Sequence, residues 1–302
     1  MLCEDEKMNF TEIQKNDITE KWGNEFFLKI LDNINLYSQQ WELYDFEYGK
    51  ITLHNLILYC KSKQWGNCVI KFYGEMWEYN ALHEYSNSKK YCKLYEFDPK
   101  TRVLLIERII PGNMLKDEPS LDKRISVFAE LFTGLHLEPK HPNKSMSYLK
   151  MMYDVTGFME KSCEENKELC THAKKAKELF IEISSAYDKE VLLHWDLHNE
   201  NILLGQNGSY KIIDPFGFIG APVLDVGRFI SKECFDAIPE NRIQTVEKIT
   251  DYFETTLKIP KSISKQCLYI DIVFLNCHWV ERGESFSIDE VRFAESVLNS
   301  CE

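Results

Sequence analysis

The hydrophobic pattern changes its period near residue 110, and this change limits the possible folds more than any other feature. Before it, residues 41–74 hold three stretches rich in aromatic and β-branched residues, a composition typical of β-strands. Turn signals separate these stretches at 48–50 and at 63–67. Because short turns join neighbouring strands, the sequence predicts an antiparallel sheet in this part of the chain.

Helical and strand patterns on either side of these stretches complete a predicted N-terminal lobe. Residues 1–40 carry apolar side chains at helical spacing and predict one or two amphipathic helices. Residues 75–94 predict a further helix, and residues 95–109 return to a strand, turn and strand pattern. We therefore expect an N-lobe over residues 1–108 and a hinge at 109–112, where a Pro-Gly pair breaks the pattern.

The remaining residues, 113–302, predict a mainly helical C-lobe. Helical spacing recurs in five segments, at 121–139, 148–162, 172–187, 242–257 and 288–298. Two short apolar runs, at 202–204 and 210–213, surround a Gln-Asn-Gly-Ser turn and predict a β-hairpin. The whole chain is thus predicted to be an α+β protein of two lobes, which agrees with its 302 residues at roughly 150 residues per domain.

Charge and composition disfavour several classes of function. The chain has 36 basic and 48 acidic residues and a formal net charge of −12, which disfavours nucleic-acid binding and suits a cationic partner. It contains no run of about 18 apolar residues, and its first residues lack the pattern of a signal peptide. We therefore expect a cytoplasmic protein without a membrane partner. Its ten cysteines form no CxxC pair and are expected to be reduced thiols, most of them in the core.

The polar cluster at 194–201, together with Asp214, is the strongest indication of chemistry. Asp196 and Asn201 precede the predicted hairpin, and Asp214 follows it. Because a hairpin brings its two ends together, these three side chains are expected to converge. Carboxylate and amide oxygens suit a Mg²⁺ ion that is shared with substrate phosphates, and phosphoryl transfer is the reaction that needs such a site.

The spacing within this cluster narrows the prediction. Asn201 follows Asp196 by five residues, as in the kinase motif HxDxxxxN, where the Asp accepts the substrate hydroxyl proton and the Asn holds a metal ion. Asp214 follows Asp196 by 18 residues, the distance of the second metal-binding Asp in kinases. A competing interpretation takes His194, Asp196 and His198 as ligands of a transition metal in a hydrolase.

Lys71 is the candidate phosphate-binding residue of the N-lobe. It ends an apolar strand, and a helix that carries glutamates follows it. In kinases, a strand lysine contacts the α- and β-phosphates of the nucleotide and is held by an ion pair to a helix glutamate. We predict this role for Lys71 and expect Glu78, or else Glu84, to be its partner. This lysine favours the kinase interpretation over the hydrolase.

The sequence around these residues resembles a known family. The segments HWDLHNENILL and KIIDPFGFIGAPVLDVGRF resemble the aminoglycoside phosphotransferase superfamily, and LLIERIIPGNML and FAELFTGLHLEP are most similar to its streptomycin and hydroxyurea kinase branch. The resemblance covers roughly residues 70–230. It implies a protein-kinase-like fold and an enzyme that moves the γ-phosphoryl group of ATP, or of GTP, to a hydroxyl group of a small molecule.

The resemblance also implies roles for individual residues. Asp196 would be the catalytic base, and Asn201 and Asp214 would be the Mg²⁺ ligands. His194 would be a structural member of the catalytic loop. Asp225 would brace that loop by hydrogen bonds.

The resemblance places the adenine site at the hinge. Backbone groups of Glu107, Arg108 and Ile109 would receive the base, and ATP is expected to bind between the lobes. The turn at 48–50 stands where protein kinases have GxGxxG, and this departure disfavours a protein substrate. Trp195 stands where the branch usually has glycine, so its ring either narrows the acceptor pocket or packs against the lobe.

The acceptor site is expected among carboxylates of the helical lobe. Cationic aminoglycosides sit among such carboxylates in the superfamily, and the acidic balance of this chain suits them. The predicted acceptor group comprises Glu233, Asp236, Trp279, Glu281 and Glu284. Trp279 is expected to offer a stacking surface for a cation.

Three functions remain open at this point. The first is ATP- and Mg²⁺-dependent phosphorylation of a streptomycin-type aminoglycoside, which would confer antibiotic resistance. The second keeps the chemistry but changes the acceptor to a metabolite such as choline, homoserine or a sugar. The third is a nucleotide-binding pseudokinase that acts through partners, and the complete set Lys71, Asp196, Asn201 and Asp214 argues against it.

Overall fold

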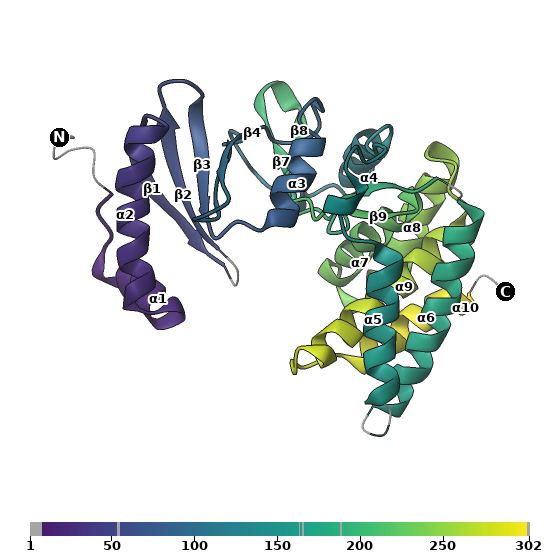
Figure 1. The fold of residues 1–302 in the computed structure, drawn as a ribbon. Coiled ribbons are helices and arrows are strands. Elements are labelled where there is room, and N and C mark those ends of the chain that lie inside the picture. The colour runs from purple at the N-terminus through teal and green to yellow at the C-terminus, as the bar shows by residue number, and fades with distance from the viewer. Residues whose placement is uncertain (1–7, 53–54, 163, 165, 188, 301–302) are drawn as a thin grey trace. The chain divides into compact units, whose positions relative to one another are not determined.

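The chain divides into two compact units, residues 1–112 and residues 113–302 (Figure 1). The boundary falls at the end of the segment 109–112, where the sequence places a hinge. Each unit contains buried apolar side chains of its own. The computed structural model describes residues 8–52, 55–162, 164, 166–187 and 189–300.

The N-terminal unit is built on a five-stranded antiparallel sheet. Two helices precede the sheet, α1 (Glu12–Trp22) and α2 (Asn24–Gln40), and α3 (Met76–Glu84) lies between its third and fourth strands in the sequence. The strand order is β1-β2-β3-β5-β4. The strands are β1 (Leu43–Ile51), β2 (Leu56–Ser62), β3 (Gly66–Phe72), β4 (Leu94–Asp98) and β5 (Val103–Glu107). The predicted order of helices and strands is confirmed.

The apolar face of α2 holds this helix on the sheet. Phe27, Ile30, Ile34 and Tyr37 recur at spacings of three and four residues, and all are buried. They form one cluster with buried side chains of β1, β2, β3 and β5. Burying each such side chain contributes roughly 1.5–3 kcal/mol, which exceeds any difference in helix propensity.

The turn predicted at 48–50 is wrong, because these residues lie inside β1. The pairing of β1 with β2 shifts its register between Tyr48 and Lys50, which marks a β-bulge. Gly49 is required there for space, since a Cβ atom on it would lie 2.7 Å from the carbonyl oxygen of Ile57. A glycine can signal either a turn or a bulge, and the local sequence does not distinguish them. The prediction that a turn at 48–50 stands where protein kinases have GxGxxG is wrong for the same reason, because these residues belong to a strand.

The C-terminal unit is mainly helical, as predicted. Its longer helices are α4 (Leu121–Phe132), α5 (Tyr148–Lys161), α6 (Lys167–Ala186), α7 (Val226–Asp236), α8 (Arg242–Thr256), α9 (Lys261–Glu281) and α10 (Ile288–Asn299). Two small antiparallel sheets interrupt them, with β6 (Val191–Leu193) paired to β9 (Phe218–Gly220) and β7 (Ile202–Leu204) paired to β8 (Tyr210–Ile212). The β7 and β8 pair confirms the predicted hairpin.

α9 is the central helix of this unit, and the sequence pattern identified neither α9 nor α7. α9 contacts α5, α6, α7, α8 and α10, and most of its residues are buried. Because apolar residues occupy all its faces, α9 lacks the one-sided pattern of a surface helix. α7 approaches α9 closely at Gly227, where a Cβ atom would lie 2.5 Å from the carbonyl oxygen of Cys267. This approach brings the polar residues that follow Gly227 next to α9.

The cysteines of the chain lie in its core wherever the structure describes them. The seven cysteines in the described part of the chain are all buried and free, which confirms the predicted core thiols there. Cys3, Cys163 and Cys301 lie outside the described residues.

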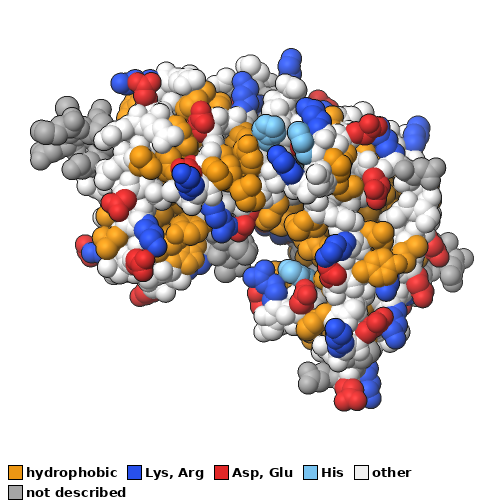
Figure 2. Space-filling view, in the orientation of Figure 1, with side chains coloured by type: hydrophobic (Ala, Val, Ile, Leu, Met, Phe, Trp, Pro, Cys, Tyr) orange, Lys and Arg blue, Asp and Glu red, His pale blue; other side chains and the backbone are white. Residues whose placement is uncertain are grey.

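None of the described helices is both long and apolar enough to span a membrane. Acidic and basic side chains are interspersed over the face shown in Figure 2.

Candidate active site

Asp225 fixes the loop between β6 and β7, which carries most of the predicted site residues. Its carboxylate is buried at the end of a short 3-10 helix, Pro222–Asp225. It accepts backbone N–H bonds from His194 at 2.8 Å and from Trp195 at 2.7 Å. The Nε2 atom of His136 lies 2.9 Å from the same carboxylate. Because a buried carboxylate needs such partners, Asp225 and the loop hold each other in place.

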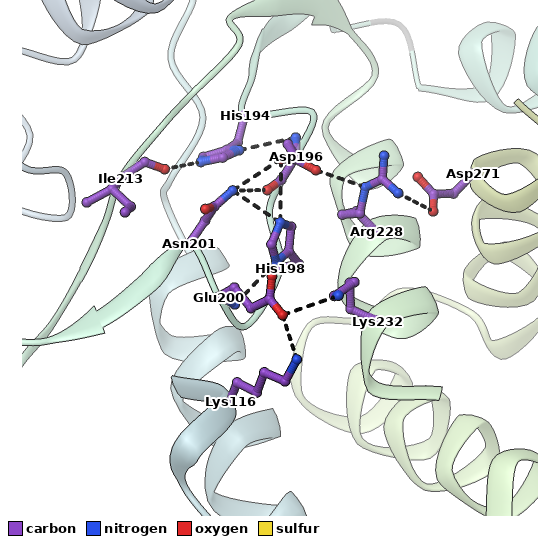
Figure 3. A network of polar contacts seen from close by, with 10 residues as sticks. All are labelled: Lys116, His194, Asp196, His198, Glu200, Asn201, Ile213, Arg228, Lys232 and Asp271. Atoms are coloured by element: carbon purple, nitrogen blue, oxygen red, sulfur yellow. Dashed lines mark hydrogen bonds and ion pairs between the residues drawn. The ribbon is translucent and has the colours of Figure 1, made fainter. Parts of the chain in front are cut away.

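His194 links this loop to the strand that leads to Asp214. Its Nε2–H donates to the carbonyl oxygen of Ile213 at 2.8 Å, and its Nδ1 accepts the backbone N–H of Asp196 at 3.2 Å (Figure 3). These contacts assign the neutral tautomer with its proton on Nε2. Burial lowers the pKa of His194, which also favours the neutral ring.

The transition-metal interpretation of His194, Asp196 and His198 is wrong. Both ring nitrogens of His194 are engaged in the contacts just described, so neither is left for a metal ion. Among the described residues, no group of three or more His, Cys, Asp or Glu side chains is arranged to hold a metal ion. The loop therefore does not present these three side chains as the His-rich metal site that the hydrolase interpretation needs.

Asp196 lies at the centre of a network of polar contacts (Figure 3). The Nε atom of Arg228 lies 3.1 Å from its Oδ1, while Asn201 Nδ2 and His198 Nε2 lie 3.2 Å and 3.4 Å from its Oδ2. Burial raises the pKa of Asp196, but the hydrogen bond with His198 and the charge of Arg228 outweigh this effect and hold the pKa at about 2. The Asp196 side chain is 27% exposed, so the ionised carboxylate is accessible from solvent.

The backbone brings Asp214 back to Asn201. β8 ends at Ile212, and the N–H of Ile213 donates to the carbonyl oxygen of Asn201 at 3.0 Å. Asp214 follows with a φ of 59°, a left-handed conformation that Asp adopts more readily than most residues. The amide nitrogen of Asn201 faces Asp196, so its Oδ1 points away from that carboxylate (Figure 3). An amide oxygen and a carboxylate are donor types that Mg²⁺ takes in proteins.

In the N-terminal unit, Lys71 and Glu78 form a buried ion pair. Lys71 lies on β3, between β2 and β5, and Glu78 lies in the first turn of α3. The Lys71 Nζ and Glu78 Oε1 atoms are 2.7 Å apart, and the two side chains are only 4% and 3% exposed. Glu78, the first of the two predicted partners, thus occupies this position. The loss of either residue would break this buried ion pair, which is typically strongly destabilising.

Trp195, beside the candidate base, has a φ of 70°, a conformation that favours glycine. Its ring lies 4.8 Å from that of Phe216 and 5.0 Å from that of Phe218, and it is edge-on to Phe274 of α9 and Tyr148 of α5. Each aromatic contact contributes about 0.5–1.5 kcal/mol beyond burial, which together offset a left-handed backbone cost of about 1–2 kcal/mol. These contacts favour the interpretation in which the ring packs against the lobe.

The residues predicted to receive adenine, 107–109, lie at the end of β5 and just after it. The backbone N–H of Glu107 donates to the backbone carbonyl oxygen of Lys93 at 2.9 Å, and the backbone N–H of Arg108 donates to that of Asn67 at 3.2 Å. Ile109, the first residue of the predicted hinge, is buried. The backbone bonds of Glu107 and Arg108 hold the segment before the hinge within the N-terminal unit.

The burial of Glu233 corrects its prediction as an acceptor residue. Its side chain is 0% exposed, and the Arg124 guanidinium contacts both carboxylate oxygens at 2.8 to 3.0 Å. Asn199 of the loop also donates to Glu233, at 2.9 Å. Asp236 accepts from Asn199 at 3.2 Å and lies 3.6 Å from Lys116. Both carboxylates of α7 therefore contact the loop, but Asp236 is exposed, so its role in binding an acceptor stays a prediction.

The other three predicted acceptor residues lie at the C-terminal end of α9 and just beyond it. Trp279 is partly exposed, and Glu281 and Glu284 are exposed. Glu281 pairs locally with His278 at 3.3 Å, and Glu284 pairs with Arg282 at 3.1 Å. Their role in binding an acceptor stays a prediction.

Two members of the site network, Arg228 and Asp271, were missed by the sequence analysis. Both lie on helices that it did not identify, α7 and α9. A signal existed for Asp271, because a lone acidic residue within an apolar helical stretch is rarely buried without a charged partner. The signal for Arg228 was its position three residues after Asp225, within the segment that carries the family resemblance.

The sequence is similar to known kinases over part of its length. Residues 79–277 match the family described as aminoglycoside/hydroxyurea antibiotic resistance kinase. The chain is 26% identical over 144 residues to streptomycin 6-kinase of Streptomyces griseus, an alignment that covers 44% of each protein. It is 25% identical over 167 residues to streptomycin 6-kinase of Streptomyces glaucescens, covering 53% of this chain and 52% of that protein. The chain thus spans about half the length of the curated relatives it matches.

The fold is similar to solved kinase structures. Choline kinase LicA from Streptococcus pneumoniae matches with a TM-score of 0.60 and 17% identity, over 91% of this chain and 99% of that one. A thermostable mutant of aminoglycoside phosphotransferase APH(4)-Ia, in a ternary complex with ADP and hygromycin B, matches with a TM-score of 0.62 and 12% identity, over 88% and 96%. These similarities confirm the predicted kinase-like fold. Because the family match at 79–277 extends over more than half of the chain, the protein belongs to the aminoglycoside/hydroxyurea antibiotic resistance kinase family.

Proposed function

We propose that the protein is a phosphotransferase that moves the γ-phosphoryl group of ATP to a hydroxyl group of a streptomycin-like aminoglycoside. The observation that carries the proposal is the 3.2 Å contact between Asp196 Oδ2 and Asn201 Nδ2 in the loop braced by Asp225. It joins an ionised, accessible carboxylate to a residue whose amide oxygen suits Mg²⁺. Membership of a kinase family supports the same class of reaction.

Asp196 is the proposed base. Its carboxylate accepts a hydrogen bond from the acceptor hydroxyl and directs that oxygen at the γ-phosphorus. A new P–O bond then forms, the bond to ADP breaks, and the hydroxyl proton passes to Asp196. With a pKa of about 2, Asp196 is a weak base, so it mainly orients the hydroxyl until that proton becomes acidic late in a loose transition state.

Asn201 and Asp214 are the residues proposed to hold Mg²⁺, through an amide oxygen and a carboxylate. The hairpin of β7 and β8 supports this assignment, because the backbone bond from the Ile213 N–H to the Asn201 carbonyl oxygen links the chain before Asp214 to Asn201. The ion, when bound, neutralises charge on the β- and γ-phosphates. The two side chains fix where that charge is neutralised relative to Asp196.

Lys71 is proposed to contact the nucleotide phosphates while Glu78 holds it in place. The buried ion pair with Glu78 fixes the position of the Lys71 ammonium group on β3. The backbone of residues 107–109 is proposed to receive the adenine base. GTP is the alternative donor. Dependence on a nucleoside triphosphate also leads us to propose the cytoplasm as the place of reaction.

A cationic acceptor is supported by charge. The chain carries a formal net charge of −12, and an acidic protein attracts polycations such as aminoglycosides. The exposed carboxylates of Asp236, Glu281 and Glu284 remain the proposed contacts, with the ring of Trp279 near the last two in the sequence. Glu233 is withdrawn from this group because its carboxylate is buried and paired.

A small quaternary amine such as choline is the second candidate acceptor. Trp195, next to Asp196 in the sequence, packs on the ring of Phe216, and both side chains are partly exposed. Aromatic faces bind quaternary ammonium groups. One structural relative is a choline kinase, at an identity that shows the fold alone. The aromatic group next to the base is therefore the specific observation that favours this alternative.

The test is a panel of acceptors. The full chain is incubated with ATP and Mg²⁺ and, in turn, streptomycin, hydroxyurea, choline, homoserine and glucose, and phosphorylated product is detected by mass spectrometry. The proposal predicts the highest kcat/KM with streptomycin. Product with choline and none with streptomycin would support the second candidate. ATP binding without any product would contradict both and favour a pseudokinase.

A further inference from the structure

Arg228 connects the proposed base to the core of the helical unit. Its Nε atom lies 3.1 Å from Asp196 Oδ1, and its Nη1 atom lies 3.5 Å from Asp271 Oδ2 (Figure 3). Arg228 lies on α7 and Asp271 on α9, next to the close approach of the two helices at Gly227. The packing of α7 on α9 therefore determines where the guanidinium lies relative to Asp196.

The Arg228 and Asp271 side chains are almost completely buried. They are 10% and 11% exposed, whereas Asp196 is 27% exposed. Although burial lowers the pKa of Arg228, the charges of Asp271 and Asp196 outweigh it and keep the guanidinium protonated. Within the described residues, Arg228 Nε and Asp271 Oδ2 make no well-aligned hydrogen bond, so these contacts are ion pairs. A buried ion triad of this kind is seldom the most stabilising choice for a core.

The contacts of Asp196 indicate what the triad does for the carboxylate. An ionised carboxylate has about four lone-pair sites, two on each oxygen. Oδ2 faces both Asn201 and His198, and Oδ1 faces Arg228. By this count one lone-pair site on Oδ1 remains for a further hydrogen bond, next to the guanidinium. Both carboxylate oxygens are thus held by neighbours, and Arg228 determines where this remaining site lies.

We infer that Arg228 is a positioning residue that holds the Asp196 carboxylate for the acceptor hydroxyl, with Asp271 as its buried anchor. The inference rests on the proposed function, because it assumes that Asp196 acts on a hydroxyl. Arg228 contacts Asp196, so in this inference it acts through that residue. Oδ1 is accordingly the oxygen that receives the hydroxyl proton.

The test compares variants of the triad with a buried ion pair elsewhere. Arg228→Met removes the guanidinium group and its charge. Arg228→Lys keeps the charge but removes the forked guanidinium that reaches both carboxylates. Asp271→Asn removes the anchoring charge at constant volume. Lys265→Met is the matched control, because Lys265 is also on α9, is 4% exposed and pairs with Glu247 at 2.6 Å. Thermal unfolding is followed by circular dichroism for every variant.

Steady-state kinetics with ATP and the best acceptor of the panel decide the outcome. A displacement of about 1 Å at a reacting group costs about 100-fold in rate, so Arg228→Met is expected to lower kcat by about that factor with KM for ATP within about threefold. Arg228→Lys and Asp271→Asn should lose about tenfold in kcat on the same basis. Lys265→Met should unfold at a lower temperature than the wild type and keep its kcat within about twofold.

The outcomes separate this inference from the proposed function. If the wild type phosphorylates no acceptor, the proposed function fails and the inference fails with it. If the wild type is active and folded Arg228→Met keeps kcat within about threefold, only the inference is overturned. Should Arg228→Met fail to fold, Arg228→Lys and Asp271→Asn decide in the same way, since an unchanged kcat in both overturns the inference.

Discussion

The side-chain amide of Asn201 donates to Asp196 twice, to the carboxylate Oδ2 at 3.2 Å and to the backbone carbonyl oxygen at 3.0 Å. This double contact closes the loop on itself and directs the amide oxygen of Asn201 away from Asp196 (Figure 3). One residue therefore both orients the proposed base and offers a ligand to Mg²⁺. The two functions should fail together when Asn201 is replaced.

Asn201→Ala is expected to weaken the use of Mg²⁺. Removing a group that binds or orients at a metal site typically costs about 10–100-fold in metal affinity, so the Mg²⁺ concentration for half-maximal rate should rise by at least about tenfold. A Mg²⁺ titration of the transfer rate measures this. Asn299→Ala, at the end of α10, serves as the control and should match the wild type. An unchanged Mg²⁺ dependence in Asn201→Ala would remove Asn201 from the metal site.

Lys71→Met is expected to destabilise the N-terminal unit as well as to impair ATP binding. It leaves Glu78 as a buried charge without this partner, which typically costs about 3–5 kcal/mol in the free energy of unfolding. The double variant Lys71→Met/Glu78→Gln should recover much of that stability but not the affinity for ATP. Denaturant unfolding and nucleotide titration measure the two effects.

The control for Lys71 is a lysine of the neighbouring strand. Lys61 of β2 pairs with Asp45, but the two side chains are 48% and 52% exposed. Exposed pairs contribute about 0–1 kcal/mol, so Lys61→Met should change neither stability nor ATP affinity appreciably. Full ATP affinity in folded Lys71→Met would disprove the proposed role of Lys71.

Asp225→Asn is expected to loosen the catalytic loop. One acceptor oxygen becomes an amide nitrogen that faces backbone donors of His194 or Trp195, and an unsatisfied buried group costs about 1–3 kcal/mol. The free energy of unfolding should fall by about that amount, and kcat should fall with it. Asp122→Asn, which breaks a surface pair with Lys248, should leave both unchanged. Equal effects of the two substitutions would contradict the bracing role.

Stability should decrease in mild acid because His194 is buried as the neutral ring. Its pKa is below the ordinary value of 6.5, chiefly because of burial, so below that pH the unfolded chain binds a proton that the folded chain does not. The free energy of unfolding therefore decreases as the pH falls from about 7 to about 5. His194→Gln should show a shallower dependence in denaturant unfolding across this range. Identical slopes for the two proteins would contradict the assignment.

Local spacing predicted the loop and hairpin because these features depend on neighbours in sequence. Asp196, Asn201 and Asp214 bracket a turn, and a turn brings its ends together whatever surrounds it. The ion pair of Lys71 and Glu78 was predictable for a similar reason. The two residues are only seven positions apart in the sequence, one on a strand and the other on the helix that follows it. Family resemblance added roles that spacing alone leaves open.

The errors have a common physical cause: burial, strand pairing and helix packing depend on residues that are distant in the sequence. Glu233 has the pattern of an exposed helix residue, and only the packing of Arg124 against it makes it internal. Gly49 has the pattern of a turn, and only the pairing of β1 with β2 makes it a bulge. Arg228 and Asp271 are 43 residues apart and meet because α7 and α9 pack closely at Gly227.

The most direct test of the account is phosphoryl transfer to streptomycin by the wild type and by Asp196→Asn. With ATP and Mg²⁺, we expect the wild type to add one phosphoryl group to streptomycin, detected by mass spectrometry. Loss of a general base costs about 10²–10⁴-fold in rate, so Asp196→Asn should be slower by at least about 100-fold while its affinity for ATP stays within about threefold. Transfer by Asp196→Asn within about tenfold of the wild type would contradict the central claim that Asp196 is the base.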